Sequence, residues 1–208
     1  MADRTAAHAL LDNLPKLHFW DGKPQVGGLD RQIASCLMDG FESVATPRVL
    51  ETGAGASTLL FLTLGPASLT SIAPDDRLRQ RIFEEAAARN IASAPLRFLV
   101  ERSEEALPRL ALDGETIDVG FIDGNHGWPA VFVDFCYINM MLRRGGVLFV
   151  DDLQLHSVAQ LFLLLRQQEQ FEFNRLDGKL AMFTKLSDER FLPDWRQEPF
   201  VAANSVMR

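Results

Sequence analysis

Short apolar runs alternate with helical stretches over most of this chain, and this alternation limits the fold more than any other feature. Five runs have the length and composition of buried strands: 49–52, 69–73, 96–101, 117–123 and 147–151. Between two of these runs, Leu78, Ile82 and Ala86 recur at the spacing of one helix face. Continuous apolar strands that alternate with helices form a parallel sheet covered on both faces. The sequence therefore predicts an α/β fold with an open, mostly parallel sheet.

The end of the chain departs from this alternation. Two strand-like runs, 171–176 and 180–186, are joined by Asp177 and Gly178, and an Asp-Gly pair favours the two-residue turn of a β-hairpin. We therefore expect an antiparallel C-terminal hairpin, which with the five earlier runs makes a seven-stranded sheet with helices on both faces. This arrangement differs from that of a dinucleotide-binding dehydrogenase domain.

The composition along the chain indicates three parts. They are an N-terminal helical approach segment, a sheet domain and a C-terminal tail, at residues 1–47, 48–186 and 187–208. In the first part, we expect a short helix, a loop over 15–28 and a second helix that Pro47 ends. The tail carries Trp195 and Phe200, which we expect to pack on the domain or on a second copy of the chain. The second case predicts a homodimer.

The charge balance and the cysteines exclude several functions. The chain has 208 residues, with 21 Lys and Arg against 28 Asp and Glu, and a net charge of −7. It has no basic stripe, so binding to nucleic acid or to anionic membranes is disfavoured. No apolar stretch approaches the ~20 residues that span a bilayer, and no signal peptide is recognisable. Cys36 and Cys136 make neither a disulfide framework nor a zinc site. We therefore expect an acidic cytoplasmic protein.

The first candidate site is a turn that contains glycines. Glu51, Gly53 and Gly55 lie where the first predicted strand of the sheet turns into a helix, the place where open α/β sheets bind ligands. The glycines permit a tight turn and close approach of a ligand. The Glu51 carboxylate would repel a pyrophosphate, and Thr58 stands where a dinucleotide fingerprint has its third glycine. We interpret this turn as a cofactor site; an ordinary strand-to-helix turn is the alternative.

The second candidate site is a group of carboxylates. Asp123 follows one predicted strand, and Asp151 and Asp152 follow the next, so all three should converge at one edge of the sheet. Three carboxylates repel one another unless a cation or protons compensate. Oxygen ligands suit a divalent cation such as Mg²⁺, which would bind Asp123, Asp151 and Asp152. The alternative is that these aspartates order a loop and cap the next helix.

His126 is the candidate base of the site. It lies three residues after Asp123, in a glycine-rich loop that opens a helix. An imidazole can take a proton from a hydroxyl at neutral pH. The alternative, of equal weight, is that its ring braces the loop. His8, His18 and His156 have no comparable context.

Three motifs in order carry a resemblance to a known family. They are Glu51-x-Gly53-x-Gly55, Ile122-Asp123-Gly124-x-His126, and the run from Arg144-Gly145-Gly146 to Asp151-Asp152. Over about residues 49–186 the chain resembles class I S-adenosylmethionine-dependent methyltransferases, most closely the small bacterial members with an Ile-Asp-Gly-x-His segment.

This resemblance implies a Rossmann-like seven-stranded sheet with a reversed last strand and S-adenosylmethionine as the cofactor. It implies that the loop from Glu51 to Ser57 holds the methionine end of the cofactor, and that Asp123 lies close to the sulfonium and the acceptor. The carboxylate group is similar to that of metal-dependent O-methyltransferases, in which a divalent ion binds two vicinal acceptor oxygens.

Two positions depart from the family pattern. Ala73 stands where the second strand usually ends in an acid that binds the ribose, and Asp75 or Asp76 would have to reach back to replace it. Near the adenine, Glu101 and Arg102 precede Ser103, where the family often has Gly-Asp. We therefore expect rearranged contacts to the nucleoside, with Asp75 and Ser103 as the binding residues.

Two functions from different classes follow. The leading one is an S-adenosylmethionine-dependent methyltransferase that acts on an oxygen of a small molecule, with His126 and Asp123 as catalytic residues. The alternative is a noncatalytic member of the same fold that binds a nucleoside or only dimerises, which the changes at Ala73 and Arg102 favour. A dehydrogenase ranks third, because Thr58 and the terminal hairpin oppose it.

Overall fold

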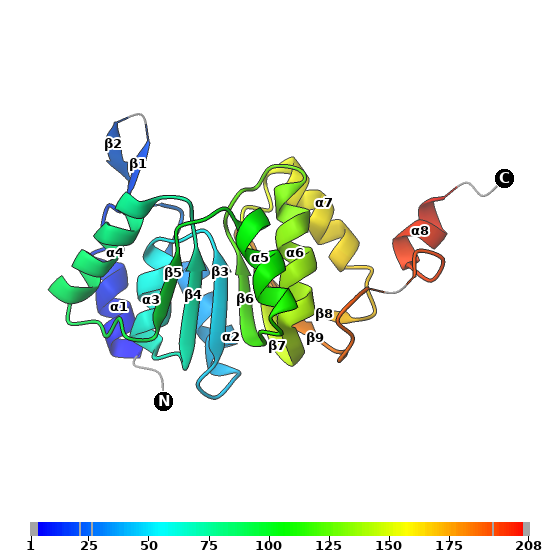
Figure 1. Ribbon diagram of the computed structural model, residues 1–208, viewed down its shortest axis with the longest axis horizontal. Helices are drawn as coiled ribbons and strands as arrows, with labels where there is room; N and C mark the ends of the chain where they lie inside the picture. The colour runs from blue at the N-terminus through cyan, green and yellow to red at the C-terminus, as the bar shows by residue number, and fades with distance from the viewer. Residues whose placement is uncertain (1–3, 21, 26, 193, 206–208) are drawn as a thin grey trace.

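The strands form one large sheet and one small hairpin (Figure 1). The computed structural model describes residues 4–20, 22–25, 27–192 and 194–205. The large sheet has seven strands, in spatial order β5 (Leu96–Leu99), β4 (Ser68–Ile72), β3 (Arg48–Thr52), β6 (Ile117–Ile122), β7 (Leu142–Val150), β9 (Leu180–Lys185) and β8 (Phe171–Asp177). The strands from β5 to β7 are parallel, whereas β9 pairs antiparallel with β7 and β8. The predicted α/β fold with an antiparallel C-terminal hairpin is confirmed.

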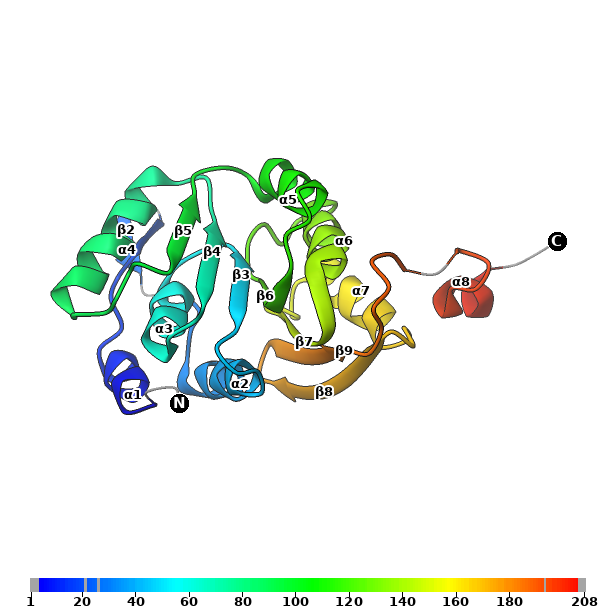
Figure 2. The same cartoon turned by 60° about the horizontal axis from the view of Figure 1, so that its bottom comes forward.

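Helices cover both faces of this sheet, as Figure 2 shows. One hydrophobic layer contains α1 (Arg4–Asp12), α2 (Arg31–Glu42), α3 (Ala56–Leu64) and α4 (Asp76–Ala88), and the other contains α5 (Ser103–Leu112), α6 (Ala130–Met141) and α7 (His156–Leu165). Successive strand residues alternate between the layers, so Val49 packs in the first and Leu50 in the second. This burial on both faces explains why the strands read as continuous apolar runs.

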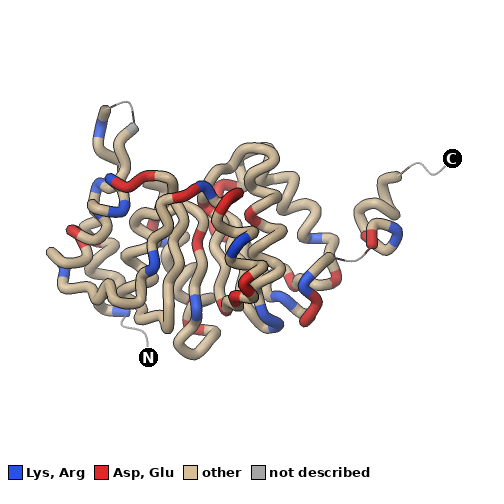
Figure 3. Tube along the Cα trace, in the orientation of Figure 1, with Lys and Arg blue, Asp and Glu red and all other residues tan. Residues whose placement is uncertain are grey.

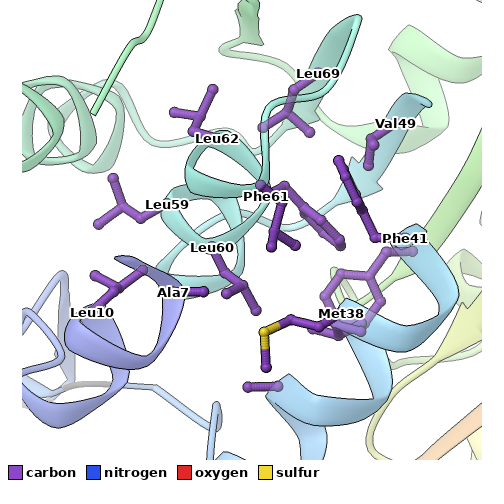
Figure 4. Close-up of a cluster of buried hydrophobic side chains, with 14 of the residues drawn as sticks. Ala7, Leu10, Met38, Phe41, Val49, Leu59, Leu60, Phe61, Leu62 and Leu69 are labelled. Atoms are coloured by element: carbon purple, nitrogen blue, oxygen red, sulfur yellow. The ribbon is translucent and has the colours of Figure 1, made fainter. Parts of the chain in front are cut away.

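The N-terminal helices belong to the hydrophobic core (Figure 4). Ala7 and Leu10 of α1 and Phe41 of α2 are buried beside α3, and the rings of Phe41 and Phe61 stack with their centroids 6.2 Å apart. These contacts fix the N-terminal segment against the first half of the sheet. The division of the chain at residue 47 stays a prediction.

Two local features differ from the sequence-based expectation. The expected loop over 15–28 contains a short antiparallel hairpin, β1 (His18–Trp20) and β2 (Lys23–Gln25), whose three-residue strands are too short to show a periodic pattern. Strand β7 begins at Leu142 and not at 147. Its first residue pairs with β6 before a bulge that includes Gly145, with φ of +73°, and regular pairing resumes at Val147.

The C-terminal tail ends in a short helix, α8 (Pro199–Asn204), which lies apart from the sheet in both views of the fold (Figures 1 and 2). Trp195 is 60% exposed and does not pack on the domain, whereas Phe200 is half-buried and lines an apolar cavity with residues of α6 and α7, so the expected packing on the domain is seen for Phe200 alone. The other expectation, a second copy of the chain, stays a prediction. Within the described residues, no helix has the length and apolarity that crossing a lipid bilayer requires.

Candidate active site

A cleft of about 1000 Å³ lies along the edge at which the parallel strands of the sheet end. Its walls come from the loops after these strands, from the N-terminal segment and from the C-terminal hairpin. Figure 3 shows acidic stretches gathered along this edge, at the top of the view. The predicted site residues that line the cleft are Gly53, Gly55, Ser57, Asp75, Ser103, Asp123, His126, Asp151 and Asp152. The structure thus brings the two candidate sites together.

The glycine turn after β3 is shaped by close backbone contacts. Gly53 has φ of +83°, and a Cβ placed on it would lie 2.2 Å from the backbone oxygen of Asp123. Only glycine fits there, because the conformation disfavours other residues and the neighbouring atom belongs to the backbone. A Cβ on Gly55 would lie 2.7 Å from Nε2 of His18. The glycines therefore let the turn pack closely against the loop after β6 and against the N-terminal hairpin.

Glu51 lies beneath this turn and not on the cleft wall. Its buried carboxylate accepts hydrogen bonds from the hydroxyls of Ser57 (2.9 Å), Ser71 (2.7 Å) and Thr58. Burial raises the pKa of Glu51 to about 7, against the opposite effect of these hydroxyls. Thr58 also accepts a bond from the Gly55 amide (3.0 Å), which explains why a threonine stands here in place of a third glycine. Glu51 therefore ties the turn to α3 and β4.

The carboxylate of Asp75, the predicted partner of the ribose, is bonded to groups of the protein itself. Asp75 is the N-cap of α4, and its Oδ1 accepts from the amides of Arg77 (2.9 Å) and Leu78 (3.0 Å). Its Oδ2 lies 3.4 Å from Nη2 of Arg81. Ala73 lines the cleft beside it. Asp75 borders the expected nucleoside position, but both of its oxygens already have partners.

The end of the cleft that is expected to hold the adenine is also polar. Ser103 is the first residue of α5 and lines the cleft with Arg102 and Glu104. The Ser103 hydroxyl donates to Oε2 of Glu104 at 3.3 Å. Contacts of Asp75 and Ser103 with a nucleoside stay predictions.

Asp123 and His126 face each other at the other end of the cleft. Nε2 of His126 lies 2.9 Å from Oδ2 of Asp152 and 3.7 Å from Oδ1 of Asp123. Burial, and then the neighbouring Asp151 carboxylate, raise the pKa of Asp123 well above its usual range. The hydrogen bond from His126 lowers the pKa of Asp152. In the described part of the chain, the Asp123 carboxylate has no hydrogen-bond partner, which leaves it open to a ligand.

The expected helix-capping role of the aspartates is not seen. Helix α7 begins at His156 after the N-cap Leu155, and no side chain caps it. Asp151 and Asp152 instead contact Lys179: its Nζ lies 2.9 Å from Oδ2 of Asp151 and also bonds Oδ1 of Asp152. The Lys179 ammonium thus compensates part of the negative charge of Asp151 and Asp152. The sequence suggests a metal ion for this role.

Lys179 was missed because it lies in the turn of the C-terminal hairpin, far from the motifs. Its place follows from the antiparallel register of β7 and β9, in which Val150 pairs with Ala181. Continuing this register sets Lys179 opposite Asp152, and the Leu153 amide donates to the Lys179 carbonyl at 3.0 Å. The hairpin was predicted, and extending its register onto β7 could have found this lysine.

Two sets of residues are candidates to bind a divalent cation. Asp123, His126 and Asp152 each offer one atom, and these atoms lie within 4.8 Å of one another. In the predicted set, Lys179 holds Oδ2 of Asp151 and Oδ1 of Asp152, whereas Oδ1 of Asp151 has no hydrogen-bond partner among the described residues and Oδ2 of Asp152 faces His126. The three-aspartate site stays a prediction.

His18 is a second cleft residue that the sequence gave no reason to select. Its ring packs against the glycine turn, and a Cβ on Gly27 would also come within 3.3 Å of it. Burial, and then the charge of Arg81, lower the pKa of His18. Arg81 donates to the Leu17 carbonyl (2.6 Å) and so fixes the start of β1. No local pattern could reveal this contact, because it joins the N-terminal hairpin to the loop after β3.

The glycine turn, the switch from parallel to antiparallel pairing and the polar cleft define a Rossmann-like methyltransferase fold. The family described as "Methyltransferase domain" matches residues 50–153, half of the chain, and the chain belongs to this family of S-adenosylmethionine-dependent methyltransferases. The predicted resemblance is confirmed. No curated protein matches the chain.

Solved structures share the fold at low sequence identity. The O-methyltransferase TomG from Streptomyces achromogenes, in complex with SAM, has 19% identity and a TM-score of 0.66, over 88% of this chain and 89% of that chain. The O-methyltransferase from Bacillus cereus, in complex with SAH, has 14% identity and a TM-score of 0.64, over 89% and 93%. The branched-chain polyamine synthase from Thermus thermophilus has 15% identity and a TM-score of 0.63, over 93% and 68%. These likenesses concern the fold.

Proposed function

We propose that this protein methylates an oxygen of a small-molecule acceptor bound at the Asp123 end of the cleft. The observation that carries the proposal is the open Asp123 carboxylate, 3.7 Å from a histidine that Asp152 holds in place. Such a group can bind a hydroxyl and take its proton. Solved structures of similar fold described as O-methyltransferases support the same class of reaction.

The residues of the cleft fit the cofactor. The turn from Gly53 to Ser57 lines the cleft, and glycines at 53 and 55 let its backbone pack closely against Asp123 and His18. We propose that this turn holds the methionine end, with Asp75 and Ser103 beside the nucleoside. When bound, S-adenosylmethionine supplies an activated methyl group on a positively charged sulfur. Glu51 would support the turn and not contact the cofactor, because its carboxylate accepts hydrogen bonds from three hydroxyls.

The residues at the acceptor end of the cleft would remove the proton of the acceptor hydroxyl. The acceptor hydroxyl donates to Asp123, whose raised pKa makes its carboxylate a stronger base. Nδ1 of His126 is buried without a hydrogen-bond partner, so the ring presents Nε2 to Asp152 and Asp123. We therefore assign Asp123 as the base and His126 as the residue that orders Asp123 and Asp152.

The charge and the size of the cleft favour a small acceptor. The net charge is −7, and five carboxylates line the cleft: Asp75, Glu104, Asp123, Asp151 and Asp152. A polyanionic nucleic acid would be repelled there. A cavity of about 1000 Å³ has room for the cofactor and a compact acceptor together.

The test is the release of S-adenosylhomocysteine from S-adenosylmethionine with a panel of phenols, catechols and aliphatic alcohols. We expect turnover with at least one acceptor, a new O-methyl group by mass spectrometry, and a loss of about a hundredfold or more in kcat for Asp123→Asn. Asp76→Asn, on the outer side of α4, is the matched control and should keep full activity. Methylation at nitrogen or carbon, or full activity of Asp123→Asn, would contradict the proposal.

The noncatalytic alternative rests on the ribose side of the cleft. Ala73 replaces an acid there, and Asp75 is engaged by helix α4 and Arg81. This alternative predicts that S-adenosylhomocysteine binds but that no acceptor in the panel is methylated.

A further inference from the structure

A second cavity, of about 460 Å³, lies between the C-terminal tail and the helices α6 and α7. Its walls are mainly apolar, and they include Phe132 and Phe135 of α6, Leu161 and Leu164 of α7, and Phe200 of α8. None of the described residues lines both this cavity and the cleft. Its volume and its apolar walls are typical of small-molecule sites, in which a few polar groups fix the orientation of the ligand.

Two buried amide side chains of this cavity each have an unused acceptor. Asn139 of α6 and Gln168 after α7 both line the cavity and are only 2% and 5% exposed. Nδ2 of Asn139 donates to the carbonyl of Arg190 at 3.2 Å, and Nε2 of Gln168 donates to the carboxylate of Glu198. Because both partners are acceptors, these contacts fix which end of each amide is the oxygen. In the part of the chain that the structure describes, Oδ1 of Asn139 and Oε1 of Gln168 are buried without a hydrogen-bond partner.

The charged residues of the cavity wall are engaged elsewhere. The Glu198 carboxylate can only accept, and its two oxygens already do so from Gln168 and from the Val201 amide. Nη2 of Arg190 donates to the Ala111 carbonyl at 2.9 Å. A buried acceptor without a partner costs free energy, and nearly all such groups in folded proteins are paired. A molecule bound in the cavity would supply the missing donor.

We propose that this cavity is a second small-molecule site, which takes a compact, neutral aromatic compound that carries an O–H or N–H donor. The apolar walls would bury the ring, and the donor would bond to the free amide oxygen of Asn139 or of Gln168. A charged compound is disfavoured, because it would lose its hydration among apolar side chains. The site is separate from the cleft, so this inference stands apart from the proposed function.

Cys136 provides the readout for a binding experiment. It is exposed and lines the cavity, whereas Cys36, the other cysteine of the chain, is buried. The experiment measures the rate at which iodoacetamide alkylates Cys136, by mass spectrometry, with indole as the probe. Indole at millimolar concentration should slow this alkylation about fivefold or more. Indene has the same shape without the N–H donor, so about tenfold more of it should be needed for equal protection.

Two pairs of proteins locate the bound indole. Leu164→Trp fills the cavity and should abolish the protection, whereas the control Leu163→Trp, on the exposed side of the same helix and outside the cavity wall, should keep it. Asn139→Leu combined with Gln168→Met removes both acceptors, so this variant should protect Cys136 equally with indole and with indene.

The comparison of indole with indene needs wild type alone, so the test does not depend on the folding of any variant. No protection by indole, or equal protection by indole and indene in wild type, would overturn the proposal. Protection that persists in Leu164→Trp would place the ligand elsewhere and would also overturn it. So would alkylation that slows with rising protein concentration in the absence of indole, because a second copy of the chain would then cover the cavity.

Discussion

Replacing Glu51 by Gln should remove a pH dependence of stability that arises beneath the cofactor turn. Glu51 is buried and bonded to three hydroxyls, and its pKa in the folded protein is about 7. Gln has nearly the same shape but does not ionise. The substitution therefore separates the charge of this side chain from its packing.

The magnitude follows from the pKa. In the unfolded chain, Glu51 loses its proton near the ordinary value of 4.5, whereas in the folded protein it keeps the proton until about pH 7. Between these values the folded state binds more protons, so wild-type stability falls as the pH rises. The full effect is about 3 kcal/mol. Burial also raises the pKa of Asp134 to about 6, but this carboxyl is present in both proteins and cancels in the comparison.

The assay is urea unfolding of wild type and Glu51→Gln, followed by circular dichroism from about pH 5 to about pH 8. The stability of the variant relative to wild type should rise by about 3 kcal/mol across this range. The control is Glu84→Gln on the exposed side of α4, whose difference from wild type should stay constant. A constant difference for Glu51→Gln as well would refute burial as the dominant influence on this carboxylate.

Two other perturbations address the core and the nucleoside side. Lys185 is buried, its ammonium donates to the carbonyls of Asn139 (2.7 Å) and Leu142 (2.9 Å), and burial lowers its pKa to about 8. Between pH 8 and 10.5 the unfolded chain holds the extra proton, so wild-type stability should rise by about 3 kcal/mol in urea unfolding, a rise that Lys185→Met should lack. Asp75→Ala should cost about 1 kcal/mol of stability through the lost cap of α4. If Asp75 also binds the ribose, the same change weakens S-adenosylhomocysteine binding about tenfold in calorimetry, whereas Asp76→Ala leaves the affinity unaltered.

Most of the fold could be predicted because its signals are local. Buried strands flanked by turn residues appear directly in the sequence, and the Asp177-Gly178 pair predicts the terminal hairpin. Its two-residue turn is Gly178-Lys179, because Asp177 still pairs with Leu180. The three-residue strands of β1 and β2 carry no such pattern. Part of β7 was also missed, since the bulge at Gly145 interrupts its apolar run.

The candidate site was predicted only where the fold brings strand ends together. Asp123, His126, Asp151 and Asp152 converge as expected. Lys179 was missed because its approach depends on the register between distant strands. Likewise, the carboxylate of Glu51 suggested a ligand contact, but hydroxyls on α3 and on the neighbouring β4 use it, and this pairing follows only from the folded arrangement.

The most direct test of the account is calorimetric titration of S-adenosylhomocysteine into wild type and Gly53→Val. We expect one site per chain in wild type and no detectable binding in the variant, because a side chain at Gly53 would meet the Asp123 backbone in the turn proposed to hold the cofactor. The circular dichroism spectrum of the variant should match that of wild type, which shows that the fold is kept. Equal affinity in both proteins, or no binding in wild type, would contradict the assignment of this cleft as the cofactor site.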